Sequence, residues 1–147
     1  MYCSSLKSVA FPESVEAIDN YAFSTWNNKL SSVYFFNKDC EIYDHAETFY
    51  TYGDCDVTFY GYKDSTAEKY ANTYAKTFVE LVEGDVSGDG ELTISDVTEI
   101  QKSLAKITEF NQGQNILGDV NGDGKTTIRD VTYIQMKLAK LIDIFPN

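Results

Sequence analysis

The sequence contains one acidic, glycine-rich phrase twice: GDVSGDGELTISDV at residues 84–97 and GDVNGDGKTTIRDV at residues 118–131. Each copy places side-chain oxygens at alternate positions of a tight turn and ends on an aspartate that opens an amphipathic stretch. A hard cation such as calcium takes about six to eight oxygen ligands in a forgiving geometry, and alternate residues wrapped around one point can supply them. The doubled phrase therefore predicts two calcium loops of the EF-hand type, each followed by a helix.

Two calcium ions are expected, with six residues around each. Loop positions 1, 3, 5 and 12 supply side-chain oxygens, position 7 supplies its backbone carbonyl, and position 9 acts through water. The predicted ligands are Asp85, Ser87, Asp89, Glu91, Thr93 and Asp96 in loop one, and Asp119, Asn121, Asp123, Lys125, Thr127 and Asp130 in loop two. The alternative is an acidic turn without metal, but three carboxylates confined to one turn repel each other strongly. The short side chain of Ser87 is expected to make loop one the weaker site.

The first half of the chain carries a fainter repeat. The triplets that begin at Val9, Val33 and Val57 lie 24 residues apart, and each alternates as a short strand requires. Such strands bury their apolar faces by stacking at a fixed period. Residues 61–81 then predict a capping helix over about residues 65–78, because Ser65 and Glu68 form a capping box and aromatic residues follow at spacing four. No comparable cap stands before the first repeat, so we expect further repeats upstream of residue 1.

The composition disfavours some classes of binding partner and is typical of a folded protein. The formal charge is −11, which disfavours a nucleic-acid partner and an anionic membrane surface. The hydrophobic share of 43% is sufficient for a packed core. The sequence has no transmembrane pattern and no secretory signal pattern at its N-terminus, so we expect it to be part of a longer chain.

Two family resemblances follow from these motifs. Doubled loop-helix units with aspartate at position 12 and no incoming helix resemble type I dockerins, and SSLKSVAFPESVEAIDNYAFSTWNNKLSSVYF resembles bacterial BspA-like leucine-rich repeats. The first resemblance implies an extracellular, calcium-dependent module that docks on a cohesin domain of a scaffoldin in a polysaccharide-degrading cellulosome. The implied fold class is α+β: the end of a leucine-rich-repeat β-solenoid at residues 1–82, followed by an all-α dockerin of two loop-helix (F-hand) units at 83–147.

The helices that leave the two loops predict a core face and a partner face. Apolar residues at helical spacing are expected in the core: Val97, Ile100, Leu104 and Ile107 in one helix, and Val131, Ile134, Leu138 and Leu141 in the other. The predicted partner-binding residues on the outer faces are Ser95, Lys102, Arg129, Tyr133, Met136, Lys137 and Lys140. An aromatic residue and a methionine on an outer face favour an interface. They could instead pack against the solenoid or against the tail at 143–147, and we expect Phe145 and Pro146 to fold back on the module's own N-terminal end.

Catalysis is not expected. His45 is the one histidine, and neither Cys40 nor Cys55 stands in a nucleophile signature. Cys40 and Cys55 could form a disulfide or remain buried thiols. We therefore interpret the chain as a non-catalytic protein that combines a dockerin with repeats for an unidentified protein or carbohydrate ligand. The alternative is the C-terminal part of a secreted cellulosomal enzyme whose catalytic domain lies upstream.

Overall fold

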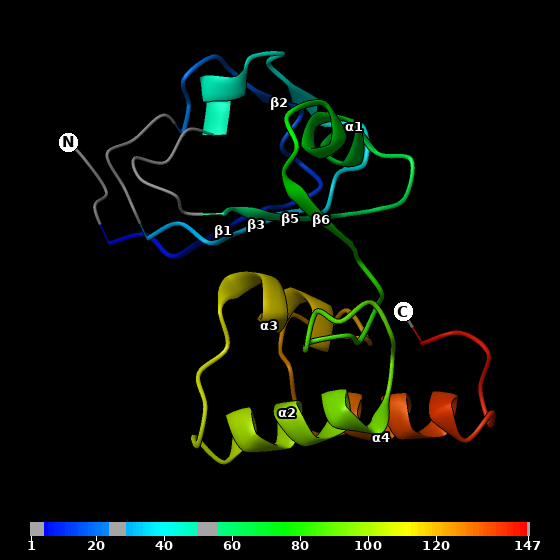
Figure 1. The fold of residues 1–147 in the computed structure, drawn as a ribbon. Coiled ribbons are helices and arrows are strands. Elements are labelled where there is room, and N and C mark those ends of the chain that lie inside the picture. Colours follow the sequence, from blue (N-terminus) through cyan, green and yellow to red (C-terminus); the bar gives the residue numbers. More distant parts are fainter. Residues whose placement is uncertain (1–4, 24–28, 50–55, 147) are drawn as a thin grey trace. The chain divides into compact units, whose positions relative to one another are not determined.

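The computed structural model describes residues 5–23, 29–49 and 56–146, and the chain divides into two compact units, Met1–Glu80 and Leu81–Asn147 (Figure 1). Unit 1 contains the strands and one α-helix, and unit 2 contains three α-helices and the two loops among its described residues. The expected α+β class is therefore confirmed. No helix in the described part of the chain is both long enough and apolar enough to cross a membrane.

Unit 1 is built on parallel strands. Strands β1 (Ser8–Phe11), β3 (Ser32–Phe35), β5 (Thr58–Gly61) and β6 (Thr77–Glu80) form one sheet in that order, and β2 (Ala17–Ile18) pairs with β4 (Glu41–Ile42) in a second sheet. The first two sequence repeats thus contribute one strand to each sheet. The leucine-rich-repeat interpretation of this segment stays a prediction.

The 24-residue period describes the pairing of β1 with β3 but not the pairing of β3 with β5. Val9 pairs with Val33, as the period predicts, but Val33 pairs with Phe59 rather than with Val57. The offset between β3 and β5 is therefore two residues longer than expected. Side chains alternate with a period of two along a strand, so this shift moves the register without turning the buried face outward. Val57 and Phe59 are both fully buried.

Aromatic side chains fill the core of unit 1. The 3₁₀ helix η1 (Ala46–Phe49) brings Phe49 against three strands and the helix, with ring centres 6.4 Å from Phe11, 6.0 Å from Phe35, 5.1 Å from Phe59 and 5.8 Å from Tyr70. These four pairs meet edge to face, the arrangement that the ring quadrupole favours. Phe49 has no exposed surface and lies at the centre of this cluster.

The capping helix is shorter than expected. Helix α1 (Thr66–Thr73) begins as predicted, with the Ser65 hydroxyl accepting the Glu68 amide at 3.2 Å. It ends where Ala75 turns to a positive φ of 50° and the Lys76 amide bonds back to the Ala71 carbonyl. Phe78 then lies in β6, opposite Phe59 of β5. The prediction of a helix to residue 78 is therefore wrong, because residues 77–80 pair with β5 as the fourth parallel strand of the sheet.

Unit 2 has a helix that the sequence analysis did not include. Helices α2 (Ile94–Leu104) and α4 (Ile128–Leu138) follow the loops as expected and pack on each other, whereas α3 (Gln112–Gly118) leads directly into loop two. Asn111 and Gln114 form a reciprocal capping box at its start. The expectation that neither loop has an incoming helix is therefore wrong for loop two, whereas β6 and a turn precede loop one.

The expected core stripe of the two exiting helices is half correct. Val97, Ile100, Val131 and Ile134 are buried. The other four members of the stripe are exposed: Leu104 at 42%, Ile107 at 73%, Leu138 at 36% and Leu141 at 72%. Leu104 and Leu138 are the last residues of their helices, and Ile107 and Leu141 lie beyond the helix ends. Lys106 and Lys140 each take a φ of 58°, and the turn they form carries Ile107 and Leu141 out of the helical register.

Cys40 is a buried free thiol, and burial raises its pKa, with a smaller contribution from the charge of Glu41. Cys3 and Cys55 lie outside the described residues. His45 is exposed; its carbonyl accepts the Tyr70 hydroxyl at 2.8 Å, and its Nδ1 accepts the Glu47 amide at 3.3 Å.

Candidate metal centres

Loop one is organised by two buried carboxylates from its ends. Asp85 is 2% exposed and Asp96 is fully buried. The carboxylate of Asp85 accepts the amides of Gly88 at 2.7 Å and Gly90 at 2.8 Å, and also the Ser87 hydroxyl at 3.0 Å. The carboxylate of Asp96 accepts the amide of Ser87 at 3.0 Å. Ser87 therefore joins the first and last acidic positions of the loop.

The electrostatics of loop one favour a bound cation. Burial raises the pKa of Asp85, and the nearby charge of Asp96 raises it further, although the amides of Gly90 and Gly88 and the Ser87 hydroxyl oppose the shift. Two carboxylates that lose water in one small loop destabilise each other unless a positive charge compensates. A divalent cation is the compensation that oxygen-only side chains are suited to bind.

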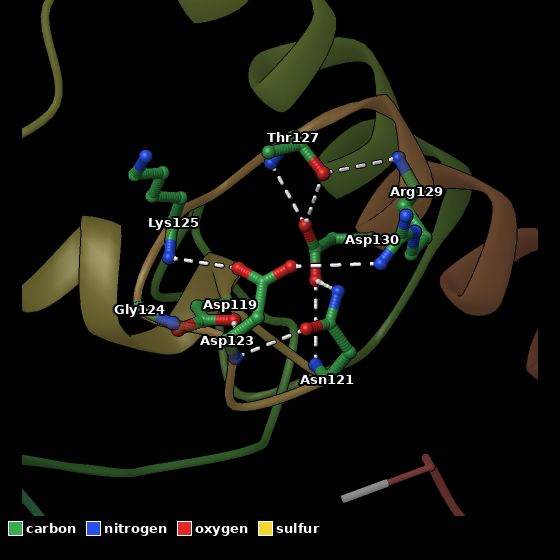
Figure 2. Close-up of polar contacts among 8 residues, drawn as sticks. All are labelled: Asp119, Asn121, Asp123, Gly124, Lys125, Thr127, Arg129 and Asp130. Atoms are coloured by element: carbon green, nitrogen blue, oxygen red, sulfur yellow. Dashed lines mark hydrogen bonds and ion pairs between the residues drawn. The ribbon is translucent and has the colours of Figure 1, made fainter.

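Loop two repeats this geometry with more bonds at its last position (Figure 2). The two oxygens of Asp130 accept the amide and the side-chain nitrogen of Asn121 at 3.3 and 2.8 Å, and the amide and hydroxyl of Thr127 at 2.8 and 3.0 Å. Asp119 accepts the amides of Asp123 at 3.1 Å and Gly124 at 2.7 Å. The first and last acidic positions thus hold the loop backbone in both copies.

The threonines at position 9 have a role that was not predicted for them. Thr93 and Thr127 are the N-cap residues of α2 and α4, and Asp96 and Asp130 complete capping boxes with them. The signal was present in the sequence as a threonine followed three residues later by an acidic residue. The same aspartate therefore both starts the helix and closes the loop.

The predicted ligands are gathered into two loops, but they do not converge on a single point in either. Within the described ranges, no group of three or more acidic, histidine or cysteine side chains lies close enough to hold a metal. The carboxylates instead accept backbone amides, and Asp89 and Asp123 each accept the amide at position 7, from Glu91 at 2.9 Å and Lys125 at 3.1 Å. The donor set of carboxylate, hydroxyl, amide and carbonyl oxygens nevertheless fits calcium chemically.

Residues of the predicted partner face have different surroundings. Ser95, Arg129 and Lys140 are exposed, and Met136 is half-buried. Lys102 is paired with Glu99 at 2.7 Å on its own helix. Tyr133 lines an open groove of about 580 Å³ together with the tail residues Ile142, Ile144, Phe145 and Pro146.

The tail is held against α4. Phe145 is buried, and the ammonium of Lys137 lies 4.0 Å from the centre of its ring, within cation–π range. Packing against the tail was one alternative for the outer face of α4. Lys137 makes this contact through Phe145, and Tyr133 shares a groove with the tail residues.

Exposed apolar residues are the feature of unit 2 that the sequence analysis missed. Ile94 and Ile128 are each 63% exposed at the start of α2 and α4, and Ile107 and Leu141 are exposed beyond the helix ends. These residues stand at equivalent positions of the two repeats. We therefore add these four residues to the candidates for a partner contact.

Comparison with known proteins identifies a family for most of unit 2. Residues 83–139 match the sequence model of the family described as Dockerin type I domain. Among solved structures, a chain of the Coh-OlpC-Doc435 complex, a novel type I cohesin–dockerin complex from Clostridium thermocellum, matches at 32% identity. The match covers 46% of this chain and 99% of that chain, with a TM-score of 0.43. No curated protein matches the chain.

Proposed function

We propose that residues 83–139, which are a type I dockerin domain, bind a cohesin domain in a calcium-dependent manner and so attach this protein to an extracellular scaffoldin of a cellulosome. The observation that carries the proposal is the family match over both loop-helix units. It is supported by apolar side chains exposed at equivalent places on the two repeats, which an interface with another protein would cover.

Each loop is proposed to hold one calcium ion. Asp85, Asp89 and Asp96 would hold the first ion, and Asp119, Asp123 and Asp130 the second, with the neutral oxygens at positions 3 and 7 completing each set. The bound ions would supply the positive charge that the buried carboxylates lack. Metal affinity would then contribute directly to the folding of unit 2 and to the shape of its docking surface.

Unit 1 is proposed to be the end of a non-catalytic leucine-rich-repeat array that presents a protein- or carbohydrate-binding surface. Support comes from the parallel pairing of β1 with β3 and of β2 with β4, each at an offset of 24 residues, and from the aromatic core that the stacked strands share. The dockerin would then place this recognition surface on the scaffold.

The function is tested by measuring the binding of the purified full chain to a panel of purified type I cohesins. We expect at least one cohesin to bind in calcium and to dissociate in excess chelator. The variant that carries Asp89→Ala and Asp123→Ala, one ligand removed from each loop, should lose this binding, whereas the matched variant with Asp39→Ala and Asp56→Ala in exposed positions of unit 1 should retain it. Binding that is equally strong in chelator would refute calcium dependence.

Tyr133 is expected to anchor the cohesin contact. The outer faces of the two helices differ, since Tyr133 stands where the other repeat has Glu99, which is paired with Lys102. Burying this ion pair in place of a tyrosine ring is costly, because both charged groups would lose their water, so we expect one dominant orientation with α4 at the centre. Tyr133→Ala should weaken cohesin binding by about 2 kcal/mol, roughly thirtyfold, and Glu99→Ala should have little effect.

A control separates this role from the tail. Tyr133 lines the same groove as Phe145, so Phe145→Ala tests whether the tyrosine acts by holding the tail. We expect Phe145→Ala to weaken cohesin binding less than Tyr133→Ala does. Equal losses from Tyr133→Ala and Glu99→Ala would show that both orientations contribute.

A further inference from the structure

The two loops differ in charge much more than in shape. Loop one, residues 85–96, has four acidic residues and no basic residue, which gives a formal charge of −4. Loop two, residues 119–130, has three acidic and two basic residues, which gives −1. The residues that make the difference are Glu91 and Ser95 in loop one, and Lys125 and Arg129 at the same positions of loop two.

The structure shows where one of these basic groups lies. A guanidinium nitrogen of Arg129 is 3.8 Å from Oδ2 of Asp123, the position-5 ligand, and Figure 2 shows the Asp123 carboxylate between this group and the Lys125 amide. The corresponding Ser95 offers no charge to Asp89. Loop two therefore carries a cation of its own at a carboxylate that a calcium ion would need.

The first carboxylates of the two loops also differ in their exposure to water. Asp85 at position 1 of loop one is 2% exposed, whereas Asp119 at the same position of loop two is half-buried and in better contact with water. Solvent and the Arg129 guanidinium thus already compensate carboxylates of loop two. The carboxylates of loop one depend more fully on the bound metal.

We propose that Arg129 lowers the calcium affinity of loop two, so that the loops fill in order, with loop one first. The inference rests on the proposed function, since it assumes that both loops bind calcium. It reverses the order expected from Ser87 alone. Ser87 replaces one neutral ligand with another, whereas each unit charge about 7 Å from a divalent ion changes the affinity by about sevenfold at the dielectric constant of water, before screening by salt.

The amides of Gly90 and Gly124 provide separate reporters for the two loops in the intact chain. Each donates to the position-1 carboxylate of its own loop, at 2.8 Å to Asp85 and 2.7 Å to Asp119. A calcium titration of the ¹⁵N-labelled full chain, followed by the two amide resonances, therefore gives one midpoint for each loop. We expect the Gly90 resonance to complete its change at a lower free calcium concentration than the Gly124 resonance.

Substitutions at Arg129 test the cause. Arg129→Ser, which installs the residue that α2 has at this place, should raise the loop-two affinity about fivefold and leave the Gly90 midpoint within about twofold. Arg129→Lys keeps the charge and should stay near the original midpoint. Lys63→Ser removes one exposed positive charge from unit 1 and controls for net charge. The reciprocal Ser95→Arg should weaken loop one by a similar factor.

The outcomes separate this inference from the proposed function. If both amides respond but loop two fills first, or if Arg129→Ser and Ser95→Arg leave both midpoints unchanged, the inference is overturned and calcium binding stands. If neither amide responds to calcium, the proposed calcium dependence is itself overturned, together with the inference.

Discussion

Chelation of calcium is expected to unfold residues 84–141 and to leave the parallel sheet of unit 1 in place. Asp85, Asp96 and Asp130 are almost fully buried, and an uncompensated buried charge costs several kcal/mol. This is a large fraction of the roughly 5–15 kcal/mol that stabilises an ordinary domain. Helical circular dichroism should fall in chelator, and amide exchange should rise across α2, α3 and α4.

The same measurement contains its own control, because unit 1 has no calcium loop among its described residues. The amides of β3 and β5 should keep their protection in chelator, and added calcium should restore the protection of α2 and α4. Magnesium should restore it poorly, because this ion keeps its waters and demands a regular octahedron. Equal loss of protection in both units would show that the chain unfolds as one cooperative body.

Phe49→Ala is expected to destabilise unit 1 by about 3–5 kcal/mol, the cost of a cavity left by a buried aromatic ring. Phe49 has no exposed surface and its ring meets four others edge to face. The result can be measured by amide exchange of β5 in increasing urea, with calcium present to keep unit 2 folded. Phe49→Leu should fall between the alanine variant and the original chain.

Tyr43→Ala is the matched control, since this aromatic residue of unit 1 is 47% exposed. Its effect should stay within about 0.5 kcal/mol, as is usual for surface substitutions. A loss from Phe49→Ala no larger than the loss from Tyr43→Ala would mean that η1 does not hold the core together. The two units should also respond independently, so neither substitution should change calcium binding.

Local signals in the sequence predicted the two loops of unit 2 and the start of α1 in unit 1. The loop positions follow from the alternation of oxygen-bearing residues, and the start of α1 follows from the Ser65 and Glu68 pair, because both features depend on neighbours within a few residues. Helix α3 was missed because it is short and carries no apolar stripe, although the Asn111 and Gln114 capping box marks its start.

The features that escaped prediction depend on distant parts of the chain. The aromatic spacing of Tyr70, Tyr74 and Phe78 fits a helix, but pairing of Phe78 with Phe59 places it in a strand. The shifted register between β3 and β5 likewise follows from packing rather than from a local pattern. Sequence periodicity shows which residues are apolar, and tertiary contacts decide which of them become buried.

The Arg129 contact shows a similar limit within the candidate site. The charges of the two loops can be counted from the sequence, but their placement cannot. The structure brings the guanidinium of Arg129 within 3.8 Å of Asp123, six residues earlier in the chain. The sequence gives the net charge of each loop, but only the folded loop shows which predicted ligand lies next to the basic group.

The number of calcium ions bound by the purified full chain tests the central claim most directly. Calorimetric titration of the calcium-free protein, with the stoichiometry checked by native mass spectrometry, should give two ions per chain. Variants with Asp85→Ala and Asp89→Ala, or with Asp119→Ala and Asp123→Ala, should each retain one ion. A chain that binds no calcium, or that binds one ion and keeps it in both paired variants, would contradict the interpretation of the doubled phrase as two calcium loops.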